Sequence, residues 1–315
     1  MPARGKRKPS RLAQRRVPKS RRKRSFFKLF WVVLGVSLVF VASLFLRRGL
    51  WSGESRLSLA IAGDRGDVTL AVFDPESGTI TTIDIPGETE VNVARQLGTW
   101  RLASVLKLGE NEGFGGRLLS ETITKSLKLP VEAWASSDAR GFIESDLRGM
   151  LKAMFSIYKT NLTLGDRINL GLFALRAKKT NRATLDLVSS GNLVRAKLAD
   201  GTFGYKLRDD TFSSRVLSVF ADNVISKSNL TVAIEDKTGR PGTAARVGEI
   251  IEVLGGKVVA IKTGGKENFD CEITGKDKDS IDKIAATFSC AKKRVSSEIN
   301  FDLEIKIGES FAKRF

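Results

Sequence analysis

The 315-residue sequence contains no histidine and only two cysteines. Without histidine, the chain has no Ser-His-Asp or Cys-His nucleophile system, no histidine ligand for zinc and no phosphohistidine relay. The cysteines, Cys271 and Cys290, are far from CxxC spacing, so neither a zinc knuckle nor a thioredoxin-type site is supported. Any catalysis must therefore use carboxylates, Lys, Arg, hydroxyl groups or a hard cation such as Mg²⁺.

Acidic residues are absent from the first 28 positions, which hold thirteen of the 53 Lys and Arg residues. The formal net charge of +18 therefore belongs mostly to this end, and the rest of the chain carries about +5. We expect residues 1–25 to form a disordered, basic, cytoplasmic tail that sets membrane topology. Binding of nucleic acid is the alternative that the same charge allows, and we consider it less favoured because it does not explain the position of the tail.

A run without charged residues extends from Leu29 to Leu46. As a helix it would measure about 27 Å, close to the roughly 30 Å of a bilayer core. We predict a transmembrane signal anchor over residues 26–48, with Phe26, Phe27 and Trp51 near the interfaces. A cleaved signal peptide is the alternative, but no small-x-small cleavage site follows the run. The excess of basic residues before the run predicts a single-pass plasma-membrane protein with its N-terminus in the cytoplasm and its main domains outside.

Apolar patterns beyond the anchor predict a mixed α/β fold. Continuous or alternating runs predict strands at Arg56–Gly63, Asp67–Asp74 and Thr79–Pro86, and helical and strand patterns then alternate. We expect an α/β domain with a mixed (α+β) sheet over residues 56–212.

A second, smaller domain is predicted after a linker at residues 213–228. Residues 229–312 read as β-α-β-β-α-β, which is similar to the split βαβ plan with two helices on one face of a small sheet. Both cysteines lie in this domain. A Cys271–Cys290 disulfide and two separate buried thiols are equally compatible with the sequence.

Two polar segments are candidate sites. The turn "AGDRGDV" places Asp64, Arg65 and Asp67 between two predicted strands, where clustered acids can bind Mg²⁺. An ordinary polar turn is the competing interpretation, because Gly, Asp and Arg are also what turns require. The segment "LRAKKTNR" gathers basic residues between Arg176 and Arg182, which would face a phosphate-bearing substrate or form a solvated helix end.

The segment "LTVAIEDKTGRPGTAARVGEIIEVLGGKVVAI", followed later by "NFDLEIKIGESF", resembles the LytR C-terminal domain over Leu230–Phe311. The single anchor with a short cytoplasmic arm also fits the LytR-CpsA-Psr group of bacterial cell-envelope proteins. The segment "IAGDRGDVTLAVFDPESGTITTIDIPGETEV" resembles, in shortened and divergent form, the opening of that group's larger module. In this resemblance Asp64 and Asp67 fall on two family acids. Gly87 stands where the family has Arg, and Glu88 where it has Asp.

The resemblance implies a role in the cell wall. The family transfers lipid-pyrophosphate-linked polymers onto peptidoglycan, using Mg²⁺ held by acids and Arg to neutralise the pyrophosphate. Since a bidentate Arg is poorly replaced at such a site, Gly87 favours a protein that binds cell-wall glycan, a lipid-linked precursor or an envelope partner without catalysis and without a cofactor.

The alternative is a Mg²⁺-dependent phosphotransferase. It would use Asp64, Arg65, Asp67 and Glu88 as catalytic residues, with Asp64 and Asp67 as the metal ligands. Arg101, Arg176 and Arg182 would bind the substrate.

Overall fold

The computed structural model describes residues 29–37, 49–208, 212–294 and 301–315. The chain divides into two compact units, Met1–Arg47 and Arg48–Phe315. In the first unit, residues 29–37 are helical, while the predicted tail and the rest of the predicted anchor lie outside the described residues. None of the described helices has the length and apolar character that crossing a membrane requires.

The unit Arg48–Phe315 begins with a five-stranded mixed sheet of order β6-β1-β2-β3-β7. The central strands β1, β2 and β3 are antiparallel, and β6 and β7 add to the two edges in parallel. The strands predicted between residues 56 and 86 are confirmed. The strands are β1 (Leu57–Ala62), β2 (Val68–Asp74), β3 (Thr79–Ile85), β6 (Ala133–Ala135) and β7 (Arg182–Asp186).

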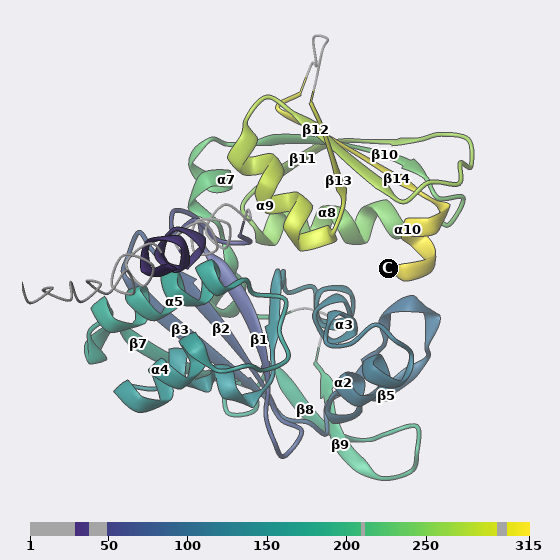
Figure 1. Cartoon of the computed structure of the whole chain (residues 1–315). Helices are drawn as coiled ribbons and strands as arrows, with labels where there is room; N and C mark the ends of the chain where they lie inside the picture. The colour runs from purple at the N-terminus through teal and green to yellow at the C-terminus, as the bar shows by residue number, and fades with distance from the viewer. Residues whose placement is uncertain (1–28, 38–48, 209–211, 295–300) are drawn as a thin grey trace, which may run out of the picture. The chain divides into compact units, whose positions relative to one another are not determined.

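Helices cover both faces of this sheet, with α2 and α3 on one side and α4 and α5 on the other (Figure 1). Every residue of β1 is buried, because successive side chains point to opposite faces and both faces are covered. Ala60 and Ala62 belong to the core under α2 and α3, whereas Leu59 and Ile61 belong to the core under α4 and α5. The helices are α2 (Leu102–Asn111), α3 (Arg117–Leu127), α4 (Leu147–Phe155) and α5 (Leu164–Arg176).

The first residues of this unit are fixed to α5. Trp51 was expected at a membrane interface, but it is buried and packs edge-on against Phe173 at 5.8 Å between ring centroids. Its backbone N–H donates to the Asp166 carboxylate at 2.9 Å. Asp166 also completes a capping box with Thr163 at the start of α5.

Short elements complete the first half of the unit, and of these the sequence predicted only β9 (Phe203–Leu207), from the strand pattern of "YKLRDD". Two antiparallel ribbons, β4-β5 and β8-β9, lie outside the main sheet. They and the 3₁₀ helices are β4 (Glu90–Asn92), β5 (Thr99–Arg101), β8 (Leu193–Lys197), β9 (Phe203–Leu207), η1 (Ala94–Gln96), η2 (Ser137–Phe142), η3 (Lys179–Asn181) and η4 (Ser218–Phe220).

The second sheet has the order β11-β10-β14-β12-β13, and α8 and α9 lie on one of its faces (Figure 1). The split βαβ prediction is wrong, because the parallel strands β10 and β11 are direct neighbours with no strand between them. Cys271 and Cys290 form a disulfide with a Cα–Cα distance of 5.0 Å. The elements are α6 (Ser214–Leu217), α7 (Asn223–Lys227), β10 (Thr231–Lys237), α8 (Thr243–Val253), β11 (Lys257–Thr263), β12 (Cys271–Gly275), α9 (Lys278–Phe288), β13 (Ala291–Arg294), β14 (Leu303–Gly308) and α10 (Glu309–Arg314).

A buried ionic cluster joins α9 to the first sheet. The Lys283 ammonium lies 2.9 Å from a Glu132 carboxylate oxygen and 3.4 Å from one of Asp222, and these side chains are 5%, 2% and 0% exposed. Glu132 also accepts hydrogen bonds from the Ser58 backbone N–H at 2.8 Å and the Thr287 hydroxyl at 3.1 Å. Charges buried this deeply persist only when they are paired, so this cluster holds the two sheets in one body.

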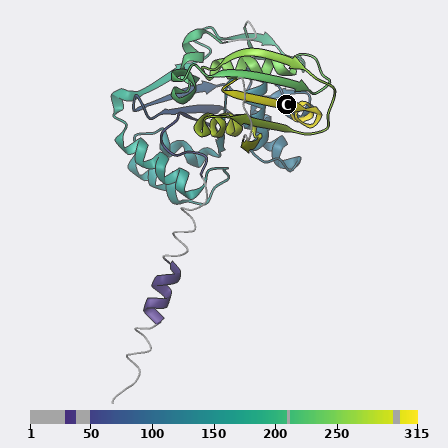
Figure 2. The same ribbon diagram turned by 90° about the horizontal axis from the view of Figure 1, so that it is seen from above.

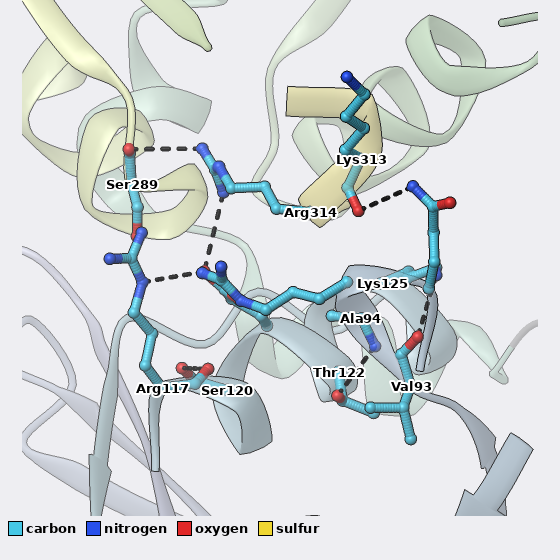
Figure 3. A network of polar contacts seen from close by, with 12 residues as sticks. Val93, Ala94, Arg117, Ser120, Thr122, Lys125, Ser289, Lys313 and Arg314 are labelled. Atoms are coloured by element: carbon cyan, nitrogen blue, oxygen red, sulfur yellow. Dashed lines mark hydrogen bonds and ion pairs between the residues drawn. The ribbon is translucent and has the colours of Figure 1, made fainter. Parts of the chain in front are cut away.

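A second polar network joins the C-terminal helix α10 to α3 (Figure 3). The Glu121 carboxylate accepts hydrogen bonds from Arg95 at 2.8 Å and Arg117 at 2.9 Å, and Arg314 lies 3.8 Å away. Arg314 also donates to the Ser289 carbonyl at 3.4 Å. The end of the chain is therefore part of the packed structure.

Candidate functional site

The turn between β1 and β2 carries three of the predicted site residues. Asp64, Arg65 and Asp67 are all exposed. The turn is closed by hydrogen bonds from the Gly63 N–H to the Asp67 carbonyl at 2.7 Å and from the Gly66 N–H to the Gly63 carbonyl at 3.1 Å. The positive φ of Gly66, 88°, is a conformation that glycine adopts without strain.

Gly87 packs directly against this turn. A Cβ atom at position 87 would lie 2.6 Å from the Gly66 carbonyl oxygen and 2.9 Å from the Ala103 Cβ. The Gly87 N–H donates to the Asp67 carboxylate at 3.2 Å, and its carbonyl accepts from the Ala103 N–H at 2.9 Å. The position where the resemblance expects an arginine is therefore closed by backbone, and a side chain there requires the turn to move.

The neighbouring acids differ in their surroundings. Glu88 is exposed, and its backbone carbonyl accepts a hydrogen bond from the Tyr205 N–H at 3.2 Å. Glu90 is paired with Lys206 at 2.9 Å, and hydrogen bonds from Lys206 and the Ala199 N–H lower its pKa. Glu90 is thus held as an anion in a structural ion pair, whereas the Glu88 carboxylate faces solvent.

The acids at the turn offer few ligands for Mg²⁺. No group of three or more acidic or cysteine side chains within the described ranges is placed to hold a metal ion. Asp64 and Asp67 remain as a two-carboxylate set, and Asp67 already accepts the Gly87 N–H. Mg²⁺ sites with one or two carboxylates rely on water and substrate phosphate for their other ligands. These acids would therefore hold the ion only together with such a ligand.

The other predicted arginines lie apart from the turn or support the fold. Arg101 pairs with Asp200 at 3.0 Å and thereby connects β5 to the loop between β8 and β9. Arg182 donates to the Ile143 and Ala174 carbonyls, both at 2.8 Å, and burial lowers its pKa.

Arg176 is exposed at the end of α5. Arg182 contacts this same end of α5 through the Ala174 carbonyl, whereas Arg101 is held on β5 by Asp200, so the three arginines do not form one group.

Two basic residues that the sequence analysis missed approach the turn instead. A Cβ atom on Gly63 would lie 2.5 Å from an Arg140 guanidinium nitrogen, and the Arg140 Nε is buried without a hydrogen-bond partner in the described structure. Lys152 pairs with Asp138 at 2.8 Å, and this hydrogen bond, aided by the negative charges of Asp138 and Asp64, raises its pKa. Arg140 lies in the irregular segment "SSDARGF", which has no motif spacing that would have identified it.

Comparisons with known proteins gave structural likenesses only. No protein-family model matches the chain, and no curated protein matches it. The chain is similar to B. subtilis TagT, with 16% identity over 50% of this chain and 86% of that chain and a TM-score of 0.37. It is similar to the Lin1025 protein from Listeria innocua, with 11% identity over 50% and 92% of the two chains and a TM-score of 0.37.

A third similar structure is the LytR-CPS2A-psr family protein YwtF (TagT) with bound octaprenyl pyrophosphate lipid, at 16% identity, 50% and 85% coverage and a TM-score of 0.36. Likenesses at this level assign neither a family nor an activity to the chain.

Proposed function

We propose that the chain is a membrane-anchored protein of the bacterial cell envelope. In this proposal its folded unit lies outside the cytoplasm and binds cell-wall glycan, a lipid-linked precursor or an envelope partner without catalysis. The charge-free run after a basic tail supports the anchoring, and the resemblance of Leu230–Phe311 to the LytR C-terminal domain supports the envelope role.

The packing of Gly87 carries the non-catalytic part of the proposal. An arginine that clamps a pyrophosphate contributes several kcal/mol of transition-state stabilisation. At position 87 the Gly66 backbone and the Ala103 side chain occupy the space that such a side chain needs. The turn and the Gly87 segment thus form a closed, hydrogen-bonded unit in place of a phosphate clamp.

Arg140 supports the alternative, a Mg²⁺-dependent transfer of lipid-pyrophosphate-linked polymers. Its guanidinium reaches the turn from η2, and its buried Nε has no hydrogen-bond partner among the described residues. A phosphate near Asp64 would lie close to the Arg140 guanidinium, and Arg presents a planar fork suited to phosphate. In this alternative Asp64 and Asp67 would hold the cation, and Arg140 would neutralise the pyrophosphate.

The test uses the purified full-length chain in detergent with Mg²⁺, a polyprenyl pyrophosphate and isolated peptidoglycan. We expect the chain to bind one of the two ligands without releasing phosphate and without forming a covalent product. Product formation that is lost in Asp64→Ala, Asp67→Ala and Arg140→Ala, but kept in the control Arg101→Ala, would replace the proposal with the alternative. Failure to bind either ligand, together with failure to co-purify with envelope components, would overturn both.

A further inference from the structure

We propose that the outward surfaces of α4 and α5 rest on the lipid bilayer, so that the folded unit lies against the membrane on a defined side. This inference relies on the membrane anchoring proposed above. The face that contacts lipid is the one formed by these two helices. The two helices run next to each other in both views (Figures 1 and 2).

The α4–α5 hairpin carries most of the exposed apolar side chains. Six of the eleven large apolar residues that are exposed in the described part of residues 49–315 lie on it: Leu147, Leu151, Phe155, Ile157, Leu172 and Leu175. Phe155 is 59% exposed, and Ile157, just after α4, is fully exposed. Monomeric soluble proteins rarely leave such a cluster uncovered, and it is typical of a protein or membrane contact.

Helical spacing makes each set a continuous stripe. Leu147, Leu151 and Phe155 recur every four residues along α4, and Leu172 and Leu175 are three residues apart on α5. The two helices contact each other through other residues. At this contact Gly171 of α5 lies so close to α4 that a Cβ there would be 2.3 Å from the Met154 sulfur. The stripes are therefore outside the helix–helix contact and remain free to meet another surface.

Basic residues border these stripes. Arg148 on α4 and Arg176, Lys178 and Lys179 at the end of α5 are exposed, and no acid pairs with them in the described residues. The acids next to α4 are Glu144 and Asp146 at its beginning, where Asp146 caps the helix, and Asp138, which pairs with Lys152. An apolar helix face with Lys and Arg at its border is the pattern of an interfacial helix at an anionic bilayer. The segment "LRAKKTNR" thereby has a role as a headgroup contact.

The entry point of the chain favours the bilayer over a protein partner. The backbone N–H of Trp51 is bonded to Asp166 in the first turn of α5, and a Cβ on Gly49 would lie 2.2 Å from an oxygen of the same carboxylate. The predicted anchor ends at residue 48, next to Gly49, and the charge-free run within it ends at Leu46, three positions before Gly49, a span of at most about 11 Å. A membrane anchor that ends there would hold α5 close to the headgroups.

The experiment uses the full-length chain reconstituted into anionic vesicles, with an environment-sensitive fluorophore on a single introduced cysteine. The test site is Phe155→Cys. The control site is Ile261→Cys on β11, an apolar position that is 48% exposed on the other sheet. Labelling without reductant spares the native cysteines, because they are joined in a disulfide. Circular dichroism checks that both variants fold.

We expect a blue-shifted emission at position 155 and at least threefold stronger quenching by nitroxide-labelled lipids there than at position 261. In the double variant Arg176→Gln/Lys179→Gln, this difference in quenching between the two positions should be smaller. Equal quenching at both sites in a chain that floats with the vesicles would overturn the docking face and leave the anchoring intact. A chain that does not float would overturn the anchoring and this inference together. A blue shift at position 155 that persists in detergent and rises with protein concentration would assign the face to a second copy of the chain instead.

Discussion

Replacing Gly87 by alanine tests whether the closed turn is a requirement of the fold. The new Cβ would lie 2.6 Å from the Gly66 carbonyl oxygen, well inside the separation of ordinary contacts, and 2.9 Å from the Ala103 Cβ. Because the first neighbour is backbone, the turn has to shift. Overpacking of this kind costs about 1–3 kcal/mol. We expect Gly87→Ala to lower the free energy of unfolding by that amount and Gly87→Arg to lower it further.

Urea denaturation measures the global effect, and hydrogen exchange at the Ala103 amide, which donates to the Gly87 carbonyl at 2.9 Å, measures the local one. Gly265→Ala is the matched control, because nothing lies within 4 Å of a Cβ at that position. If Gly87→Ala and Gly265→Ala unfold alike and exchange alike at Ala103, the packing argument is refuted. A stable Gly87→Arg variant that gains affinity for pyrophosphate would likewise show that the position is an open clamp.

Three further predictions concern stability. Lys283→Met should cost about 3–5 kcal/mol, because it leaves two buried carboxylates without their cation; a urea midpoint like that of the unmutated chain would contradict this. Reducing the Cys271–Cys290 disulfide should cost about 2–4 kcal/mol by freeing the loop that it closes in the unfolded chain, and an unfolding curve unchanged by reductant would show otherwise. Burial raises the pKa of Asp74, but hydrogen bonds from Ser77 and Arg56 outweigh it and hold the pKa below the usual 3.8. The stability that this carboxylate contributes is therefore present above about pH 4 and lost as the pH falls through the lowered pKa, and Asp74→Asn should flatten that loss in acid titrations of unfolding.

Hydrophobic pattern predicted the centre of the main sheet because β1 and β2 are buried on both faces and β3 alternates buried with more exposed positions. The runs that contain β1, β2 and β3 leave little alternative to a strand. The segment "GRLLSETITKSL" has helical spacing that predicts Leu118 and Ile123 on one face, and this face of α3 is buried. The ribbon β4-β5 and the strand β8 escaped prediction because they are short and contain several polar residues, so their pairing depends on tertiary contacts. Ser145 and Asp146, both of a capping type, precede α4. The sequence pattern favours Ser145 as the N-cap, whereas the structure uses Asp146, one residue later.

Strand order and site geometry depend on contacts that a linear pattern does not contain. The sequence predicted four of the strands in the second domain, but whether β10 lies beside β11 or apart from it is decided by packing of the connecting helix. The same holds at the turn. Gly87 in the sequence reads as the loss of an arginine, whereas the structure shows a glycine that the approach of Gly66 requires. Arg140 reaches the turn from a segment more than seventy residues later in the chain, with no motif to indicate it.

Helix α4 is involved both in the proposed ligand binding at the turn and in the proposed membrane contact. A ligand that is itself anchored in the membrane would therefore suit the turn. The negative charge of Asp64 helps to raise the pKa of Lys152. Lys152 lies on the same helix as the apolar stripe of Leu147, Leu151 and Phe155. Because Lys152 directly follows Leu151 of this stripe and is close enough to Asp64 for the charge of the acid to raise its pKa, a bilayer against α4 would lie near the turn. A lipid-linked phosphate would then reach Asp64 while its tail stays in the membrane. We expect a polyprenyl pyrophosphate in vesicles to bind more tightly than soluble pyrophosphate, and Phe155→Ser to reduce only the lipid affinity. Equal affinity for both forms would separate the turn from the membrane face.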